Sequence, residues 1–281
     1  MNYRHAFHAG NFADVFKHAL LARMLVYLTR KDAPLRYLDT HAGVGLYNLS
    51  SDEALRTGEW RDGIGRVIAA DPPAGIAALL KPWLDVVAWG DSNDARKYPG
   101  SPVLAQRLTR PIDRLILCEL HEHDQRMLAR NIGRDRRIKS IRIDGYMALN
   151  AYVPPPERRG LVLIDPPFED RAEFDAMAEA LEAAWTKWPT GTYALWYPIK
   201  RPVEVATFAR RLASGAIRRV LLIELDVARV VEEAPLSGNG MIIVNPPFGL
   251  EAEARALLPW LTKTLARGEG ARWRVDWLAG E

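Results

Sequence analysis

The sequence has only one cysteine, which excludes an internal disulfide and a cysteine-based metal cluster. Cys118 lies in an apolar run, as core residues do. No hydrophobic stretch is long enough to span a bilayer, and no apolar signal core follows residues 1–5. The 281 residues are 48 % hydrophobic and 26 % charged, which is ordinary for a folded soluble chain. We therefore expect a cytoplasmic protein of one large or two smaller domains.

A strong excess of charge is also missing, because the formal net charge is only +3 although the sequence pI is about 9.0. This balance permits a nucleic-acid partner without demanding one. The basic residues instead gather in short clusters, at residues 134–139, 158–159, 200–201, 210–211 and 218–219. One such cluster is typical of a solvated face, whereas several on one rim would bind phosphates.

The most informative stretch is LVLIDPPF, at residues 161–168. Its aliphatic run predicts a strand buried on both faces, as central parallel strands are. Pro166 cannot donate to a sheet ladder, so the strand must end at Asp165. Ligands bind at this end of the strands in an open α/β sheet. The Asp165 carboxylate, the free carbonyls and the Phe168 ring could therefore hold a planar molecule with an exocyclic amino group.

Two other turns have a similar sequence. ADPPA at residues 70–74 has no hydrophobic run before it and no aromatic residue after it, which predicts a loop. NPPF at residues 245–248 does follow a predicted strand, at 241–244. The turns alone do not decide between Asp165 and Asn245 as the functional one.

Strands and helices alternate along most of the chain, which predicts an α/β fold. The predicted strands lie at residues 36–39, 115–119, 140–145, 161–164, 192–197, 220–225 and 241–244. The predicted helices lie at about 12–29, 103–109, 122–133, 146–151, 171–187 and 202–213. Asn11 and Ser101 are candidate caps for the first two of these helices. The last two strands lack a strong helix between them and predict an antiparallel hairpin.

This alternation breaks between residues 49 and 98. The segment contains three tryptophans and helix-like stretches near 53–69 and 75–85, but no strong strand. An ordinary βα unit needs only about 30 residues. We therefore expect a small helical insertion subdomain at 49–98, within one Rossmann-like domain formed by residues 1–48 and 99–281.

Four successive predicted strands end in an acid: Asp39, Glu119, Asp144 and Asp165. Gly43 and Gly45 follow the first of them and allow close approach of a ligand, although Asn48 stands at the third glycine position of the dinucleotide fingerprint. Carboxylates at one sheet edge suit a hydroxyl-rich, partly cationic ligand such as S-adenosylmethionine (SAM). Glu119 could accept both ribose hydroxyls, and Asp144 could accept the adenine amino group.

Four of the six histidines precede residue 42: His5, His8, His18 and His41. A metal site is one hypothesis, but no spacing typical of a catalytic metal accompanies them. We expect a histidine cluster beside a polar ligand, and no metal.

Five stretches together resemble a known family: YRHAFHAGN at 3–11, YLDTHAG at 37–43, YPGSP at 98–102, GLVLIDPPF at 160–168 and YALWYP at 193–198. They are similar to the RlmJ family, the adenine-N6 methyltransferases of 23S ribosomal RNA. The resemblance spans nearly the whole chain. It implies a Rossmann-like class I SAM-dependent methyltransferase, with a seven-stranded, mostly parallel sheet and a small inserted helical subdomain.

The resemblance also implies roles for individual residues. SAM contacts would fall on His18, His41, Ser101, Glu119, Asp144 and Gly145. The catalytic turn, with Asp165, Pro166 and Phe168, follows the fourth strand in this fold, so Asn245 after the seventh is expected to be structural. Tyr3 would contact the RNA. The implied partner is 23S ribosomal RNA, protein-free or partly assembled, bound by a monomer without metal or membrane.

The implied reaction is in-line transfer of a methyl group from SAM to N6 of a flipped adenine. Asp165 and the Pro166 carbonyl would hold the amino group, Asp165 would accept its proton, and Phe168 would stack on the base. The alternatives are a DNA adenine-N6 methyltransferase with the same turn, a nicotinamide-dependent oxidoreductase and a non-catalytic RNA-binding assembly factor. The missing third glycine argues against the oxidoreductase, and the intact acidic strand ends argue against the assembly factor.

Overall fold

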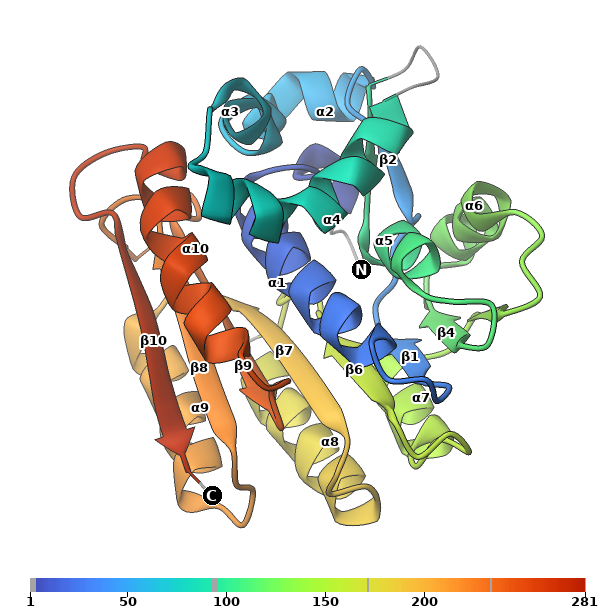
Figure 1. The fold of residues 1–281 in the computed structure, drawn as a ribbon. Helices are drawn as coiled ribbons and strands as arrows, with labels where there is room; N and C mark the ends of the chain where they lie inside the picture. Colours follow the sequence, from blue (N-terminus) through green and yellow to red (C-terminus); the bar gives the residue numbers. More distant parts are fainter. Residues whose placement is uncertain (1–3, 92–95, 171, 233, 281) are drawn as a thin grey trace.

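The computed structural model describes residues 4–91, 96–170, 172–232 and 234–280, and its helices and strands alternate along most of the chain (Figure 1). The strands are β1 (Arg36–Asp39), β2 (Leu46–Asn48), β3 (Lys97–Pro99), β4 (Arg114–Cys118), β5 (Ile138–Ile141), β6 (Gly160–Ile164), β7 (Thr192–Pro198), β8 (Val220–Asp226), β9 (Gly238–Val244) and β10 (Arg272–Ala279). The α-helices are α1 (Phe12–Thr29), α2 (Asp52–Thr57), α3 (Ile64–Ala69), α4 (Ala74–Asp91), α5 (Ser101–Leu108), α6 (Glu122–Ile132), α7 (Gly145–Tyr152), α8 (Glu173–Lys187), α9 (Pro202–Ser214) and α10 (Leu250–Leu265). Two short 3-10 helices are η1 (His5–Phe7) and η2 (Glu59–Arg61).

The main sheet has eight strands in the order β10-β8-β9-β7-β6-β1-β4-β5. The strands from β7 to β5 in this order are parallel, so the carboxyl ends of β6, β1, β4 and β5 meet at one edge. β9 is antiparallel to both β7 and β8, which confirms the predicted hairpin. The chain turns from one half of the sheet to the other beside β1, and ligands bind at such a switch point.

The expected count of seven strands is wrong, because β10 adds an eighth strand at the edge of the sheet, antiparallel to β8. Val275 is its one fully buried residue, and Trp273 and Trp277 are partly exposed. A largely exposed edge strand lacks the apolar run that predicts a buried strand, so the sequence did not predict β10.

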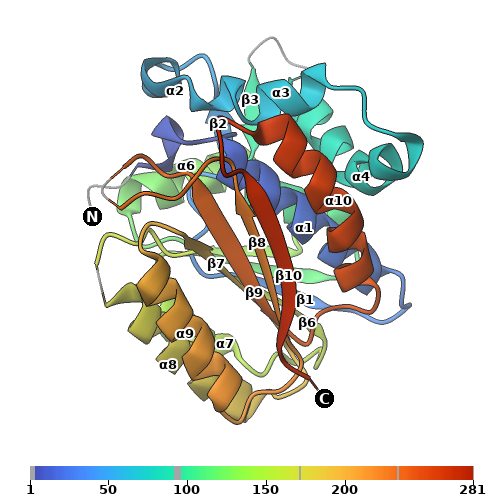
Figure 2. The same cartoon turned by 90° about the vertical axis from the view of Figure 1, so that its left-hand side faces the viewer.

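Helices cover both faces of the sheet. Leu161 and Leu163 of β6 pack into the core that contains α1, α5, α6 and α10, whereas Val162 and Ile164 pack against α7, α8 and α9. This alternation follows from the two-residue period of a strand. Figure 2 shows α8 and α9 on one side of the sheet and α1 and α10 on the other. Both faces of the central strands are therefore buried, as their continuous apolar sequence predicts.

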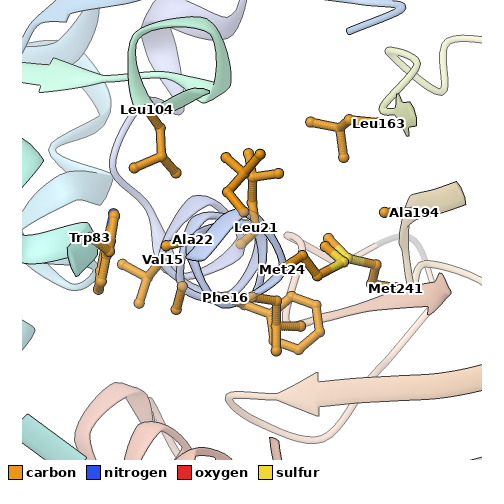
Figure 3. Packing of buried hydrophobic residues seen from close by; sticks show 14 of the residues in the cluster. Val15, Phe16, Leu21, Ala22, Met24, Trp83, Leu104, Leu163, Ala194 and Met241 are labelled. Atoms are coloured by element: carbon orange, nitrogen blue, oxygen red, sulfur yellow. The ribbon is translucent and has the colours of Figure 1, made fainter. Parts of the chain in front are cut away.

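α1 is enclosed on nearly all sides. The side-chain oxygen of Asn11 accepts hydrogen bonds from the amides of Ala13 and Asp14, which confirms the predicted cap. In Figure 3, α1 is flanked by side chains from α4, α5 and the sheet, among them Trp83, Leu104 and Met241. Every residue from Phe12 to Leu25 is buried. Polar side chains on this helix are therefore buried too and require partners.

Between β2 and β3 the chain forms α2, η2, α3 and α4, which lie above the amino-terminal end of α1 in Figure 1. The helical stretch expected at 53–69 is broken at Gly58, where φ is +64°, and again near Gly63. β2 and β3 pair with each other as a short antiparallel ladder that the sequence did not predict. Three residues per strand are too few to show a period of two. The ADPPA stretch is a loop between α3 and α4, as expected.

Two expected boundaries are wrong. Ser101 does not cap α5, because Gly100 occupies that position and Ser101 is the first helical residue. The strand expected at 140–145 ends at Ile141, and Asp144 instead caps α7. Among the described residues, no helix combines the length and the apolar character that a membrane span requires.

Candidate active site

A cavity of about 520 Å³ opens at the carboxyl ends of the parallel strands. This volume lies within the range of about 300–1,000 Å³ that is usual for small-molecule sites. The sequence-predicted site residues that line it are His18, His41, Ser101, Glu119, Asp144, Gly145, Asp165, Pro166 and Phe168. Tyr3, the expected RNA contact, lies outside the described residues. Residues from six separate elements are thus brought to one space.

Glu119 follows β4 and is held by backbone amides on both sides. Its Oε2 accepts from Gly43 at 2.9 Å, and its Oε1 accepts from His121 at 2.8 Å. Burial raises the pKa of this carboxyl although both amides favour the charged form. Each carboxylate oxygen can still accept a further bond, so two neighbouring hydroxyl groups of a ribose suit this side chain.

Asp144 and Gly145 form the start of α7. Asp144 Oδ1 accepts from the amides of Tyr146 and Met147, at 3.0 and 2.9 Å, which fixes the carboxylate at the helix end. A Cβ atom on residue 145 would lie 2.4 Å from the carbonyl oxygen of Thr40, so only glycine fits there. Asp144 Oδ2 makes no hydrogen bond within the described part of the chain and suits an amino group of a ligand.

His41 and His18 are both neutral, for the same reason. Burial lowers the pKa of His41 to about 4 and that of His18 to about 3. His41 Nδ1 is hydrogen-bonded to the hydroxyl of Thr40, and His18 Nδ1 to that of Tyr98, each at 2.8 Å. The two imidazoles thus provide neutral hydrogen-bonding groups beside the acids.

Asp39, at the end of β1, is fully buried. Its Oδ2 accepts from the hydroxyl of Tyr37 at 2.9 Å, whereas Oδ1 has no hydrogen-bond partner in the structure as described. Burial raises the pKa of Asp39 to about 6, against the opposing effect of the Ser101 and Tyr37 hydroxyls. Asp39 is not among the residues that line the cavity, so only Glu119, Asp144 and Asp165 of the four predicted strand-end acids border it.

Asp165 forms an ion pair that the sequence did not reveal. Lys17 is 5 % exposed. Its Nζ donates to Asp165 Oδ2 at 2.6 Å and lies 3.0 Å from Asp14 Oδ1. Burial opposes the ammonium charge, but the two carboxylates outweigh it and raise the pKa of Lys17. Asp14 also accepts from the amide of Gly10 and is hydrogen-bonded to His5, each at 2.9 Å. α1 thus supplies a fixed cation for the turn after β6.

Aromatic rings surround the same turn. The ring of Phe168 lies 5.0 Å from that of Phe174 and 6.0 Å from that of Trp196, and Lys17 Nζ lies 5.5 Å from the Trp196 ring centroid. Phe168 has a φ of +50°, which a bulky residue rarely adopts and which is often retained at functional sites. Lys17 and Trp196 were not assigned to the site from the sequence alone. The available signals were a lysine in a largely apolar helix and the tryptophan of YALWYP.

The NPPF turn lies at the opposite edge of the sheet, because β9 runs antiparallel to β7. Asn245 Nδ2 donates to the carbonyls of Pro189 and Gly191, at 2.7 and 2.8 Å. Phe248 is 86 % exposed. Neither Asn245 nor Phe248 lines the cavity. The expectation that Asn245 has a structural role is therefore confirmed.

The strand order and the acidic strand ends define a Rossmann-like class I methyltransferase. A family model described as ribosomal RNA large subunit methyltransferase D, RlmJ, matches residues 32–279. Ribosomal RNA large subunit methyltransferases J of Haemophilus influenzae and Escherichia coli are 40 % and 39 % identical to the chain, over the full length of both partners in each comparison. A crystal structure from Legionella pneumophila, 35 % identical, matches with a TM-score of 0.87 over 96 % of this chain and 98 % of its own.

The chain belongs to the RlmJ family. It is an enzyme, a methyltransferase, and SAM is its methyl donor. The cavity fits this donor on two observations: the Glu119 carboxylate is fixed by two amides, and so is the Asp144 carboxylate at the start of α7. Membership excludes the oxidoreductase and the non-catalytic factor that the sequence left open.

Proposed function

We propose that this chain methylates N6 of an adenine in 23S ribosomal RNA, with the target base flipped out of its stack. The names of the two curated relatives support ribosomal RNA as the substrate. The observation that carries the proposal is the Asp165 turn, which lines the same cavity as the acids suited to the donor. A base entering beside Phe168 would meet the donor within that one space.

Bound SAM supplies an electrophilic methyl group on its sulfonium. In the proposal, Glu119 holds the ribose, Asp144 and Gly145 hold the adenine ring, and His18, His41 and Ser101 complete the donor site. The fixed carboxylates and the neutral imidazoles are preorganised for this task by the backbone and hydroxyl contacts described above. Residues 49–98 act as an insertion subdomain beside the domain of residues 1–48 and 99–281.

Asp165 and the carbonyl of Pro166 orient the adenine amino group. The lone pair of N6 is delocalised into the ring, so acceptors that hold both N–H groups favour a more pyramidal and more nucleophilic nitrogen. Asp165 Oδ1 is available for this, because Lys17 binds Oδ2. Asp165 then receives the proton that N6 loses. Lys17 is a positioning residue, and Phe168 stacks on the base, which is worth about 1–3 kcal/mol.

The same proposal includes a cytoplasmic monomer that works without a metal on protein-free or partly assembled RNA, with Tyr3 in contact with the RNA. The test is transfer of labelled methyl from SAM to 23S ribosomal RNA isolated from cells that lack this protein, followed by mapping of the product nucleotide. We expect one N6-methyladenine. An unlabelled DNA competitor of the same sequence should not reduce incorporation. Labelling of the DNA instead, or of a base other than adenine, would contradict the proposal.

A further inference from the structure

Some exposed arginines in the described chain pair with a carboxylate, as Arg126 does with Glu122 and Arg255 with Glu251. A few lie over aromatic rings instead and form no ion pair with any described residue. Four of these lie over rings at or beside the amino-terminal end of α1: Arg56 over Phe7 at 5.7 Å, Arg61 and Arg96 over Trp60 at 5.1 and 5.5 Å, and Arg267 over Phe12 at 5.0 Å. We name these four residues the arginine wall.

The segments that carry these rings are tied to one another. The amide of Ile64 donates to the carbonyl of Gly10 at 2.8 Å, and Thr57 donates through its hydroxyl to the carbonyl of Phe7. A Cβ atom on residue 10 would lie 3.3 Å from the Cβ of Trp60. α2 and α3 therefore sit beside the amino-terminal end of α1, as Figures 1 and 2 show.

The wall meets the cavity through Arg267, which lines it together with Phe12 and Glu59. Arg56, Arg61 and Arg96 are not among the lining residues. Glu59, which precedes Trp60, lines the cavity beside Arg267, and it is already engaged. Burial opposes its charge, whereas hydrogen bonds from His8 and Asn11, together with the Arg267 charge, lower the pKa of that carboxyl. The negative charge of Glu59 is thus stabilised by His8, Asn11 and Arg267, and Glu59 forms no ion pair with the other three arginines of the wall.

Stacking on a ring holds a guanidinium in place without neutralising it. The ring attracts the cation by about 0.5–1 kcal/mol at an exposed site, and the N–H groups at the edge of the planar group remain available. Those donors match the oxygens of a phosphate and bind it in a bidentate manner. A carboxylate partner would occupy the same donors. The arginine wall therefore suits a polyanion, and its rings are covered by cations rather than free to stack on bases.

We propose that the arginine wall binds the phosphate backbone of the RNA strand next to the target adenine. The insertion then holds the RNA while the cavity receives the base, and the contact contributes affinity without reading sequence. This inference rests on the proposed function for the identity of the polyanion. It gives the insertion at 49–98 a specific task, which the acidic strand ends alone do not.

The test compares the full-length protein with the double variant Arg56→Gln/Arg61→Gln. Binding to a 23S ribosomal RNA transcript is measured by fluorescence anisotropy between 50 and 300 mM salt, in the absence of SAM. Loss of two phosphate contacts should lower the slope of log K against log salt by roughly 1.4 to 1.8. KM for RNA should rise, whereas the SAM dissociation constant and kcat at saturating RNA should stay within about twofold, because neither Arg56 nor Arg61 lines the cavity.

The matched control is Arg211→Gln/Arg255→Gln, which removes the same charge from arginines of α9 and α10 that pair with Glu182 of α8 and Glu251 of α10. Its salt slope should equal that of the wild type. An unchanged slope in the wall variant would overturn the inference, and so would a loss of SAM affinity, which would indicate a structural role. If the wild type binds the transcript but transfers no methyl group to it, the proposed function fails while the binding comparison still decides the role of the wall.

Discussion

The turns DPPF at 165–168 and NPPF at 245–248 are nearly identical in sequence but lie at opposite edges of the sheet. Each contains one non-glycine residue at a φ of +50°, Phe168 in the first and Asn245 in the second. The first follows a strand of the parallel half of the sheet and lines the cavity, whereas the second follows antiparallel β9 and lies at the far edge. Strand direction, and not the tetrapeptide, decides which turn can meet a ligand.

The first residue of each turn matches its surroundings. Asp165 faces an ammonium group, and its carboxylate accepts from Lys17. Asn245 faces two carbonyls, and its amide donates to both. An aspartate at 245 would have no proton to donate there, and an asparagine at 165 would carry no charge for Lys17. The comparison therefore predicts unequal consequences of matched substitutions.

The largest effect is expected for Asp165→Asn, which converts the first turn into a copy of the second. An amide cannot accept the proton from N6, so methyl transfer should fall at least about 100-fold. SAM affinity should stay within about twofold, because the donor is held by other residues. The measurements are labelled-methyl transfer and calorimetric titration with SAM. Transfer within about threefold of the wild type would show that the carboxylate at 165 is dispensable.

Lys17→Met tests the charge that distinguishes the two environments. The change leaves Asp14 and Asp165 close together without a buried cation, and breaking such a pair costs about 3–5 kcal/mol. The free energy of unfolding, measured with urea, should fall by about that much. Lys81→Met is the matched control, because the exposed Lys81–Asp85 pair contributes less than about 1 kcal/mol. Equal losses in both variants would refute a special role for Lys17.

The acids near the strand ends, the Asn11 cap and the β8–β9 hairpin could be predicted from the sequence, because each depends on neighbouring residues. The ion pair between Lys17 and Asp165 could not, because its partners are 148 positions apart. Periodicity reports which face of a helix is apolar, whereas α1 is buried on its polar face too, including Asp14, Lys17 and His18. Glu119, Asp144 and Asp165 line one cavity only because the strands before them end at the same edge of the sheet, which is a property of the topology rather than of any motif.

Acid should destabilise the cavity end of the molecule through His18, which is 1 % exposed. Burial lowers its folded pKa to about 3, whereas an unfolded histidine titrates near 6.5. Below pH 6.5 the unfolded chain binds the proton first, so stability falls as the pH is lowered toward 3 and is retained above 6.5. At pH 5 this loss amounts to roughly 2 kcal/mol. Urea unfolding of His18→Gln should show a correspondingly shallower decline between pH 7 and 5, and an identical decline would contradict the assignment.

The smallest effects come from the aromatic residues that end the two turns. Phe168→Ala should raise KM for RNA about tenfold, since stacking on a base is worth about 1–3 kcal/mol, and should leave SAM affinity unchanged. Phe248→Ala removes a ring that is 86 % exposed and distant from the cavity, so KM and kcat should stay within about twofold. Steady-state kinetics with the same transcript compares the two variants directly. If both lose the same activity, the sheet edge at which a turn lies does not determine its function, and the distinction between Asp165 and Asn245 fails with it.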